Sequence, residues 1–235
     1  MSSETQTSPG YPLSAPQPIY EIWIDALVKP NVETYQSIGR HPNASATRGF
    51  LWLFLAYLIS TLISVMGAAF LGSLSTILGD QGAGAAPGVA GLSGLTLLCI
   101  APLGAVLGVL FLAIIAGISN LIARAVGGTG SFGQLVYVFA AYLAPLTIIS
   151  SVLGIVPILN CVTIPLGFYG LFLNILAIKA VHELSWGKAI LSSVVVIGGI
   201  LIFVAVFVIV ILALLGPAIG NVFENIVEEI ATPVP

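Results

Sequence analysis

The sequence predicts an all-α integral membrane protein with five transmembrane helices. Charged residues make up only 6% of its 235 residues, and the mean hydropathy is +1.14. A soluble domain carries about 25% charged residues, so a soluble globular protein is excluded. Charge is absent from four stretches, 49–79, 81–123, 125–178 and 189–223. Each can cross the hydrocarbon core, which takes roughly 20 helical residues, and 125–178 is long enough to cross twice.

The N-terminal part of the chain divides into a polar tail and an amphipathic segment. Residues 1–18 are rich in Ser, Thr, Gln and Pro, so we expect a disordered cytoplasmic tail. Residues 19–48 carry apolar positions at helical spacing, and Pro30 is suited to start a second helical turn that Gly39 would end. Two interpretations stay open: the segment lies on the membrane surface, or Trp23 and its neighbours pack against the ends of the protein's own spans.

Turn-forming residues divide the apolar stretches into spans. A Gly- and Pro-rich mobile loop is expected over 79–94, and breaks are expected at Gly127–Gly133 and at 157–160. Gly216 and Pro217 are expected to end the last helix before an acidic outer tail, 216–235. The resulting spans are about 49–71, 95–123, 134–156, 159–178 and 187–215.

The basic residues predict the orientation of the chain. With five spans all six lie on one side of the membrane: Lys29, Arg40 and Arg48 before the first span, Arg124 between the second and third, and Lys179 and Lys188 between the fourth and fifth. Lys and Arg in short loops stay on the cytoplasmic side. The N-terminus is therefore expected in the cytoplasm and the C-terminus outside.

The spans contain no residue types that predict chemistry. No ionisable residue lies at mid-depth, which argues against a proton- or sodium-coupled transporter. We expect no catalytic residue, metal or cofactor, because His, Cys and acidic residues do not cluster. His182 and Ser185 are the nearest base and nucleophile, but Ser185 fits better as an N-cap, and His182 with Glu183 as a wetted turn. Six scattered basic residues also exclude a nucleic-acid partner.

The glycine-rich segment Gly127–Gly133 predicts a structural turn. It lacks the Lys and the spacing of a phosphate-binding loop. Ser131 and Gln134 instead have the spacing of a capping box at the start of the third span. Small residues at helix-contact spacing are Gly104 and Gly108 in the second span, and Ala140 and Ala144 in the third.

Two prolines make the third and fourth spans candidates for bent helices. Pro145 and Pro165 each remove a backbone hydrogen bond, and a bent helix can line a cavity. Nearby polar side chains either line such a cavity or join helices and satisfy freed carbonyls; they are Asn120, Thr147 and Asn174. Cys99 and Cys161 both fall near the outer face, and we expect buried apolar thiols rather than a bridge.

Three segments together resemble the Yip (Ypt/Rab-interacting protein) domain family in its prokaryotic form. They are LIARAVGGTGSFGQLVYVFAAYLAP at Leu121–Pro145, LAIKAVHELSWGKAI at Leu176–Ile190 and ALVKPNVETYQSI at Ala26–Ile38. The resemblance implies a five-span domain with a cytoplasmic N-terminus. Eukaryotic relatives bind Rab-type GTPases, but the acidic DLYGP-type motif of those relatives is absent here, so this role is not carried over.

The leading functional hypothesis is a non-enzymatic scaffold or adaptor in a bacterial plasma membrane. Its cytoplasmic face would bind a protein partner or organise lipid, and homo-oligomerisation is left open. The alternative is an uncoupled channel or permease for a small neutral or lipid-like solute, lined by the bent spans; an enzyme acting on lipid is the weakest reading. The candidate residues of the cytoplasmic face are Trp23, Lys29, Pro30, Arg40, Arg124, Lys179, His182 and Lys188.

Overall fold

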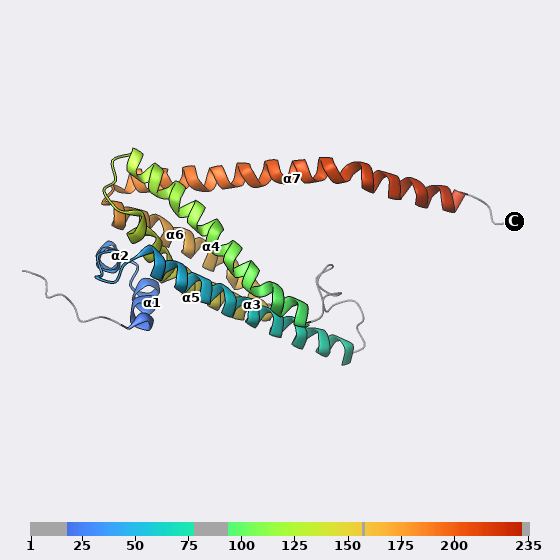
Figure 1. Cartoon of the computed structure of the whole chain (residues 1–235), viewed down its shortest axis with the longest axis horizontal. Helices are drawn as coiled ribbons and strands as arrows, with labels where there is room; N and C mark the ends of the chain where they lie inside the picture. Colours follow the sequence, from blue (N-terminus) through green and yellow to red (C-terminus); the bar gives the residue numbers. More distant parts are fainter. Residues whose placement is uncertain (1–17, 78–93, 157, 232–235) are drawn as a thin grey trace, which may run out of the picture. The chain divides into compact units, whose positions relative to one another are not determined.

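The computed structural model describes residues 18–77, 94–156 and 158–231, which form helices and turns without a strand (Figure 1). The chain divides into two units, Met1–Ser192 and Ser193–Pro235. The expected tail over 1–18, except its last residue, and the expected loop over 79–94, except its last residue, lie outside the described residues. The Cys99 side chain also lies outside them, whereas the Cys161 thiol is free but exposed, so the expectation that it is buried is wrong.

Within the described residues, five helices are long and apolar enough to cross a membrane, which agrees with the predicted number. They are α3 (Ala46–Ile77), α4 (Gly94–Ala125), α5 (Phe132–Ile155), α6 (Thr163–His182) and α7 (Trp186–Ala231). The segments with spanning character are Ala46–Gly72, Ala101–Ala125, Phe132–Ile155, Leu159–His182 and Trp186–Gly216. The chain is therefore an all-helical integral membrane protein.

Two short helices precede the first span, α1 (Ile19–Val28) and α2 (Val32–Gly39). The start of α2 differs from the prediction: Pro30 lies before the helix, and Asn31 is the N-cap. The Asn31 side chain accepts a hydrogen bond from the Thr34 amide at 2.7 Å. An Asn side chain satisfies one of the free amides of the first turn, which a proline cannot do.

Two proline predictions are wrong. A short 3-10 helix, η1 (Leu159–Val162), comes before α6, so Pro165 lies in the first turn of α6. An amide there has no partner within the helix, and Pro165 therefore removes no helical hydrogen bond. At the other end, α7 continues through residues 216 and 217 to Ala231. A proline removes one hydrogen bond, and the residues on both sides of it keep theirs.

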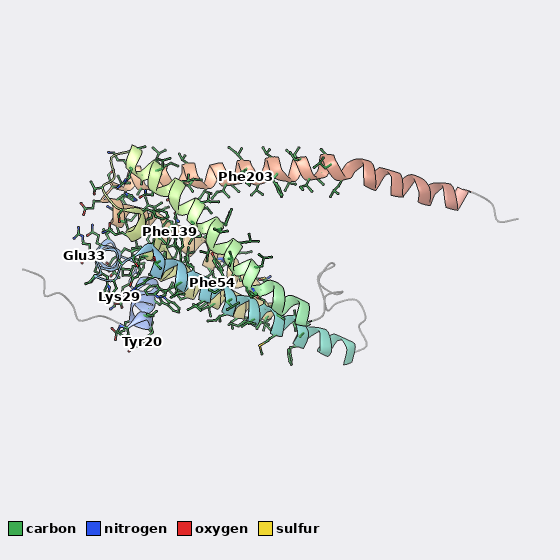
Figure 2. All side chains as sticks on the ribbon, viewed as in Figure 1. Tyr20, Lys29, Glu33, Phe54, Phe139 and Phe203 are labelled. Carbon is green, nitrogen blue, oxygen red and sulfur yellow. The ribbon has the colours of Figure 1, made fainter. Side chains whose placement is uncertain are left out.

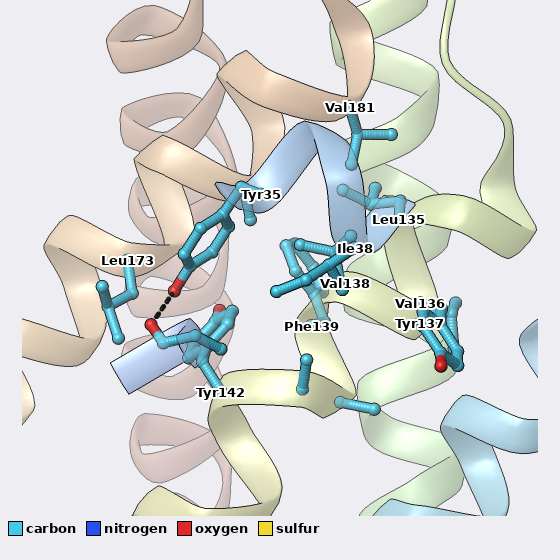
Figure 3. Close-up of a cluster of buried hydrophobic side chains, with 14 of the residues drawn as sticks. Tyr35, Ile38, Leu135, Val136, Tyr137, Val138, Phe139, Tyr142, Leu173 and Val181 are labelled. Carbon is cyan, nitrogen blue, oxygen red and sulfur yellow. Dashed lines mark hydrogen bonds between the residues drawn. The ribbon is translucent and has the colours of Figure 1, made fainter. Parts of the chain in front are cut away.

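Helix α5 is the centre of the first unit, because α1, α2, α3, α4 and α6 all contact it. Every residue from Leu135 to Tyr142 is buried, and so are both predicted small residues, Ala140 and Ala144. Figure 3 shows this core, in which aromatic and aliphatic side chains of α5 meet Tyr35 and Ile38 of α2. In α4, only one of the two glycines predicted to form a helix-contact face packs against another helix.

Within that α4 face, Gly108 packs against α3. A Cβ added at Gly108 would lie 3.1 Å from Cδ2 of Tyr57, whereas a Cβ at Gly104 would meet no described atom within 4 Å. Gly108 therefore allows close packing of α4 against α3, and Gly104 does not take part in it.

Candidate functional site at the basic end

Three connections of the first unit meet at one end of the bundle: the end of α2, the turn between α4 and α5, and the turn between α6 and α7. The Thr129 amide donates a hydrogen bond to the His182 carbonyl at 3.3 Å. Arg40 at the end of α2 forms an ion pair with Glu183 at 2.6 Å, although the two residues are 143 positions apart in the chain. We call this surface, which carries Arg40, Arg124, Lys179 and Lys188, the basic end.

The α4–α5 turn lies directly on the end of α6. A Cβ added at Gly130 would collide with the Val181 carbonyl oxygen and lie 2.7 Å from Val181 Cγ1. A Cβ at Gly128 would lie 2.7 Å from His182 Cβ, and Gly127 has a φ of 99°. Only glycine fits these positions without displacing the turn. The prediction of a structural glycine turn therefore agrees with the geometry.

The predicted capping box is confirmed. Ser131 is the N-cap of α5, its side chain accepts a hydrogen bond from the Gln134 amide at 3.3 Å, and the Ser131 amide donates to Gln134 Oε1 at 3.0 Å. Two amides of the first turn are satisfied in this way. The cap fixes where the turn ends and α5 begins.

Helix α6 ends in a left-handed residue that is not glycine. Glu183 has φ 54° and ψ 35°, and the Leu184 amide donates to the Lys179 carbonyl at 3.1 Å. This is the hydrogen bond of a Schellman motif, in which glycine usually takes the left-handed position. Here the position carries a carboxylate that forms an exposed ion pair with Arg40, so the end of α6 contacts the end of α2.

Most basic side chains at this end bind groups of the protein itself. Arg124 Nε donates to the Gly130 carbonyl at 3.4 Å, and Lys179 Nζ donates to the Leu184 carbonyl at 3.1 Å and lies 5.1 Å from the Trp186 ring centroid. Lys188 is exposed and has no carboxylate within salt-bridge distance among the described residues. Its charge is therefore the one most open to a partner.

The prediction that His182 lies in a wetted turn is wrong. The sequence favours a wetted turn, but the His182 side chain is 1% exposed because the Gly128 backbone packs on it. Neither ring nitrogen has a hydrogen-bond partner within the described residues. The Ser185 carbonyl accepts the Ala189 amide at 3.0 Å, which places Ser185 at the backbone N-cap of α7.

An open cavity of about 180 Å³ lies between α2, the α4–α5 turn and the end of α6. Its lining is mainly polar; the residues are Gln36, Gly39, Arg40, Thr129, Gly130, Gln134, Ala180, Val181 and Glu183. A guanidinium, a carboxylate, two amides and a hydroxyl can bind polar groups of a partner through hydrogen bonds and charge. Sequence patterns gave no signal for Gln36 or Thr129, because their role depends on contacts distant in the chain.

The remaining candidate residues of the face lie elsewhere. Trp23 of α1 packs edge-on against Trp52 of α3, with ring centroids 6.1 Å apart. Lys29 forms an ion pair with Asp25 at 2.9 Å, and Pro30 lies half-buried in the link between α1 and α2. None of these residues lines the cavity at the basic end.

The residues proposed to line a channel mostly bind within the bundle. Thr147 Oγ1 donates to the Ala144 carbonyl at 2.9 Å, and Asn174 Nδ2 donates to the Tyr142 hydroxyl at 3.3 Å. Pro145 lies inside α5, and Asn120 Oδ1 is buried without a hydrogen-bond partner among the described residues. The Asn174 bond links α6 to α5, the Thr147 bond stays within α5, and none of Asn120, Thr147 and Asn174 lines the cavity at the basic end.

Comparison with known proteins assigns the family. The family model of the Yip1 domain matches residues 24–208, which is most of the chain and includes all five spans in whole or in part. No curated protein and no solved structure matches the chain. The chain belongs to the Yip1 domain family.

Proposed function

We propose that this Yip1 domain protein is a non-enzymatic membrane scaffold or adaptor that binds a protein partner or organises lipid through its basic end. The observation that carries the proposal is the convergence of three connections into one surface with a polar cavity. The Arg40–Glu183 ion pair and the glycine contacts hold that surface in shape. A surface fixed before binding loses less entropy when a partner docks.

A site-specific crosslinking experiment tests partner binding. A photoreactive residue is placed at Gln36, which lines the cavity, and in a control variant at Glu33, which is exposed on the same helix. Adducts in cells are identified by mass spectrometry of proteins and lipids. A protein or lipid adduct that forms at Gln36 and not at Glu33, and that decreases in a Lys188→Gln variant, supports the proposal. Equal adducts at both positions would refute it.

We also propose that the basic end faces the cytoplasm of a bacterial cell. The proposal rests on the basic residues of the loops, which the membrane-insertion machinery retains on the cytoplasmic side. Exposed Cys161, in the connection between α5 and α6, provides a direct test. In a chain with Cys99→Ser, a membrane-impermeant maleimide should label Cys161 in intact cells and fail to label a Lys188→Cys variant that also carries Cys161→Ser. Labelling of the Lys188→Cys variant alone would reverse the orientation.

A further inference from the structure

Helix α1 presents three separate faces. Ile22 and Ala26 are 2% and 0% exposed, and they pack into the bundle beside Trp23. The second face is apolar and exposed: Tyr20, Ile24 and Val28 are 62%, 54% and 70% exposed, and Figure 2 labels Tyr20 at the start of the helix. The spacing of four residues places these three side chains in one row.

The third face carries the charges of α1. It consists of Glu21, Asp25 and Lys29, which also follow one another at a spacing of four residues. Each charged residue comes directly after one of the exposed apolar residues, so the two rows lie side by side, about 100° apart around the helix. The exposed surface of α1 is thus divided into an apolar row and a charged row. This division is typical of a helix at a boundary between lipid and water.

The contacts of α1 place it beside membrane-spanning segments. The Tyr169 hydroxyl of α6 donates to the Leu27 carbonyl, and Trp23 packs against Trp52 of α3. Tyr169 and Trp52 both belong to candidate spans. The helix therefore packs against two candidate membrane-spanning segments, and its apolar row is exposed beside them.

The carbonyls at the end of α1 provide independent support. The last carbonyls of a helix have no partner within it and are usually left to water. Here the Tyr35 hydroxyl donates to the Ala26 carbonyl at 2.9 Å (Figure 3), and the Tyr169 hydroxyl donates to that of Leu27. Two terminal carbonyls are thus satisfied by tyrosine hydroxyls from other helices, which suits an environment of low polarity.

We infer that α1 lies in the interfacial layer of one leaflet, with Tyr20, Ile24 and Val28 against lipid acyl chains and the charged row toward water. The contact is hydrophobic rather than electrostatic, because the row carries two carboxylates and one ammonium group, and Lys29 is already paired with Asp25. It should therefore form with neutral lipid and resist salt. This surface is separate from the cavity at the basic end, so its test does not depend on the proposed function.

Fluorescence quenching by lipid tests the inference. The full chain with Cys99→Ser and Cys161→Ser receives one cysteine, either Ile24→Cys on the apolar row or Glu21→Cys on the charged row. Each variant is labelled with a small environment-sensitive fluorophore and reconstituted into vesicles of neutral phosphatidylcholine with brominated acyl chains. We expect bromine to quench the label at position 24 several-fold more strongly than at 21, at low and at high salt.

Two results would overturn the inference. Equal quenching at both positions would place neither row in the acyl layer. Weak quenching at position 24 together with disulfide crosslinking between Ile24→Cys chains would show that a second copy, not lipid, covers the row. Both substituted positions are exposed, so neither variant should disturb folding.

Discussion

The α4–α5 turn lies so close to the end of α6 that one methyl group added at Gly130 should strongly lower the free energy of unfolding. In a Gly130→Ala variant the Cβ would collide with the Val181 carbonyl oxygen and lie 2.8 Å from the carbonyl carbon. Backbone atoms cannot rotate away, so the turn must move. Overpacking of this kind costs about 1–3 kcal/mol, and loss of the hydrogen bond from the Thr129 amide adds about 1 kcal/mol.

The free energy of unfolding should therefore fall by about 2–4 kcal/mol, less the gain of up to about 1 kcal/mol from a stiffer unfolded chain. The net loss of about 1–4 kcal/mol lowers the midpoint of thermal unfolding by roughly 3–12 °C, at about 3 °C per kcal/mol for a chain of this size. The measurement is the loss of the monodisperse peak in size-exclusion chromatography after heating in mild detergent.

Gly133→Ala is the matched control. A Cβ at Gly133 would lie 3.5 Å from the nearest described atom, the Ala46 amide nitrogen, which is an ordinary van der Waals distance. Because Gly133 is the second residue of α5, alanine there should raise stability by up to about 1 kcal/mol through helix propensity. If Gly130→Ala unfolds at the same temperature as Gly133→Ala, the close approach of the turn to α6 is wrong.

Three further predictions concern side chains near the basic end and use the same heating assay. Tyr35→Phe leaves the Ala26 carbonyl without its donor and should cost about 1–3 kcal/mol; an unchanged midpoint would mean that the hydrogen bond does not form. Ser131→Ala should lose about 1 kcal/mol with the capping box, and Ser131→Asp should restore it; equal midpoints for both variants would contradict the cap. Burial, and to a smaller extent the charge of Arg48, hold the pKa of His41 below its ordinary value of 6.5. The unfolded chain therefore binds the proton more tightly than the folded chain, and the free energy of unfolding falls as pH decreases through about 6.5. Between about pH 7 and about pH 5, His41→Gln should lose less stability than the unsubstituted chain, and parallel curves would refute this.

The fold could be predicted because membrane spans depend on local composition. A helix that crosses lipid satisfies its own backbone, so apolar length and the placement of charges indicate each span. The Ser131 cap is equally local, since its two partners are three residues apart. The starting point of α6 was not predictable in this way, because η1 shifts the helix start and moves Pro165 into its first turn.

The candidate site depends on contacts that no local pattern contains. Arg40 and Glu183 are 143 positions apart, and their pairing requires α2 to return to the end of α6. His182 is buried for the same reason, because the Gly128 backbone from a distant turn covers it. The sequence therefore indicated which residues are distinctive at this end, and the tertiary structure decided which of them are buried, paired or exposed.

Helix α2 links helix α1 to the cavity at the basic end. The Tyr35 hydroxyl near its middle donates to the Ala26 carbonyl of α1, and Arg40 at its end pairs with Glu183 beside the cavity. At a rise of about 1.5 Å per residue, Tyr35 and Arg40 lie less than two helical turns apart. Because Tyr35 is adjacent in the chain to Gln36 of the cavity wall, a change that displaces α1 should also displace residues that line the cavity.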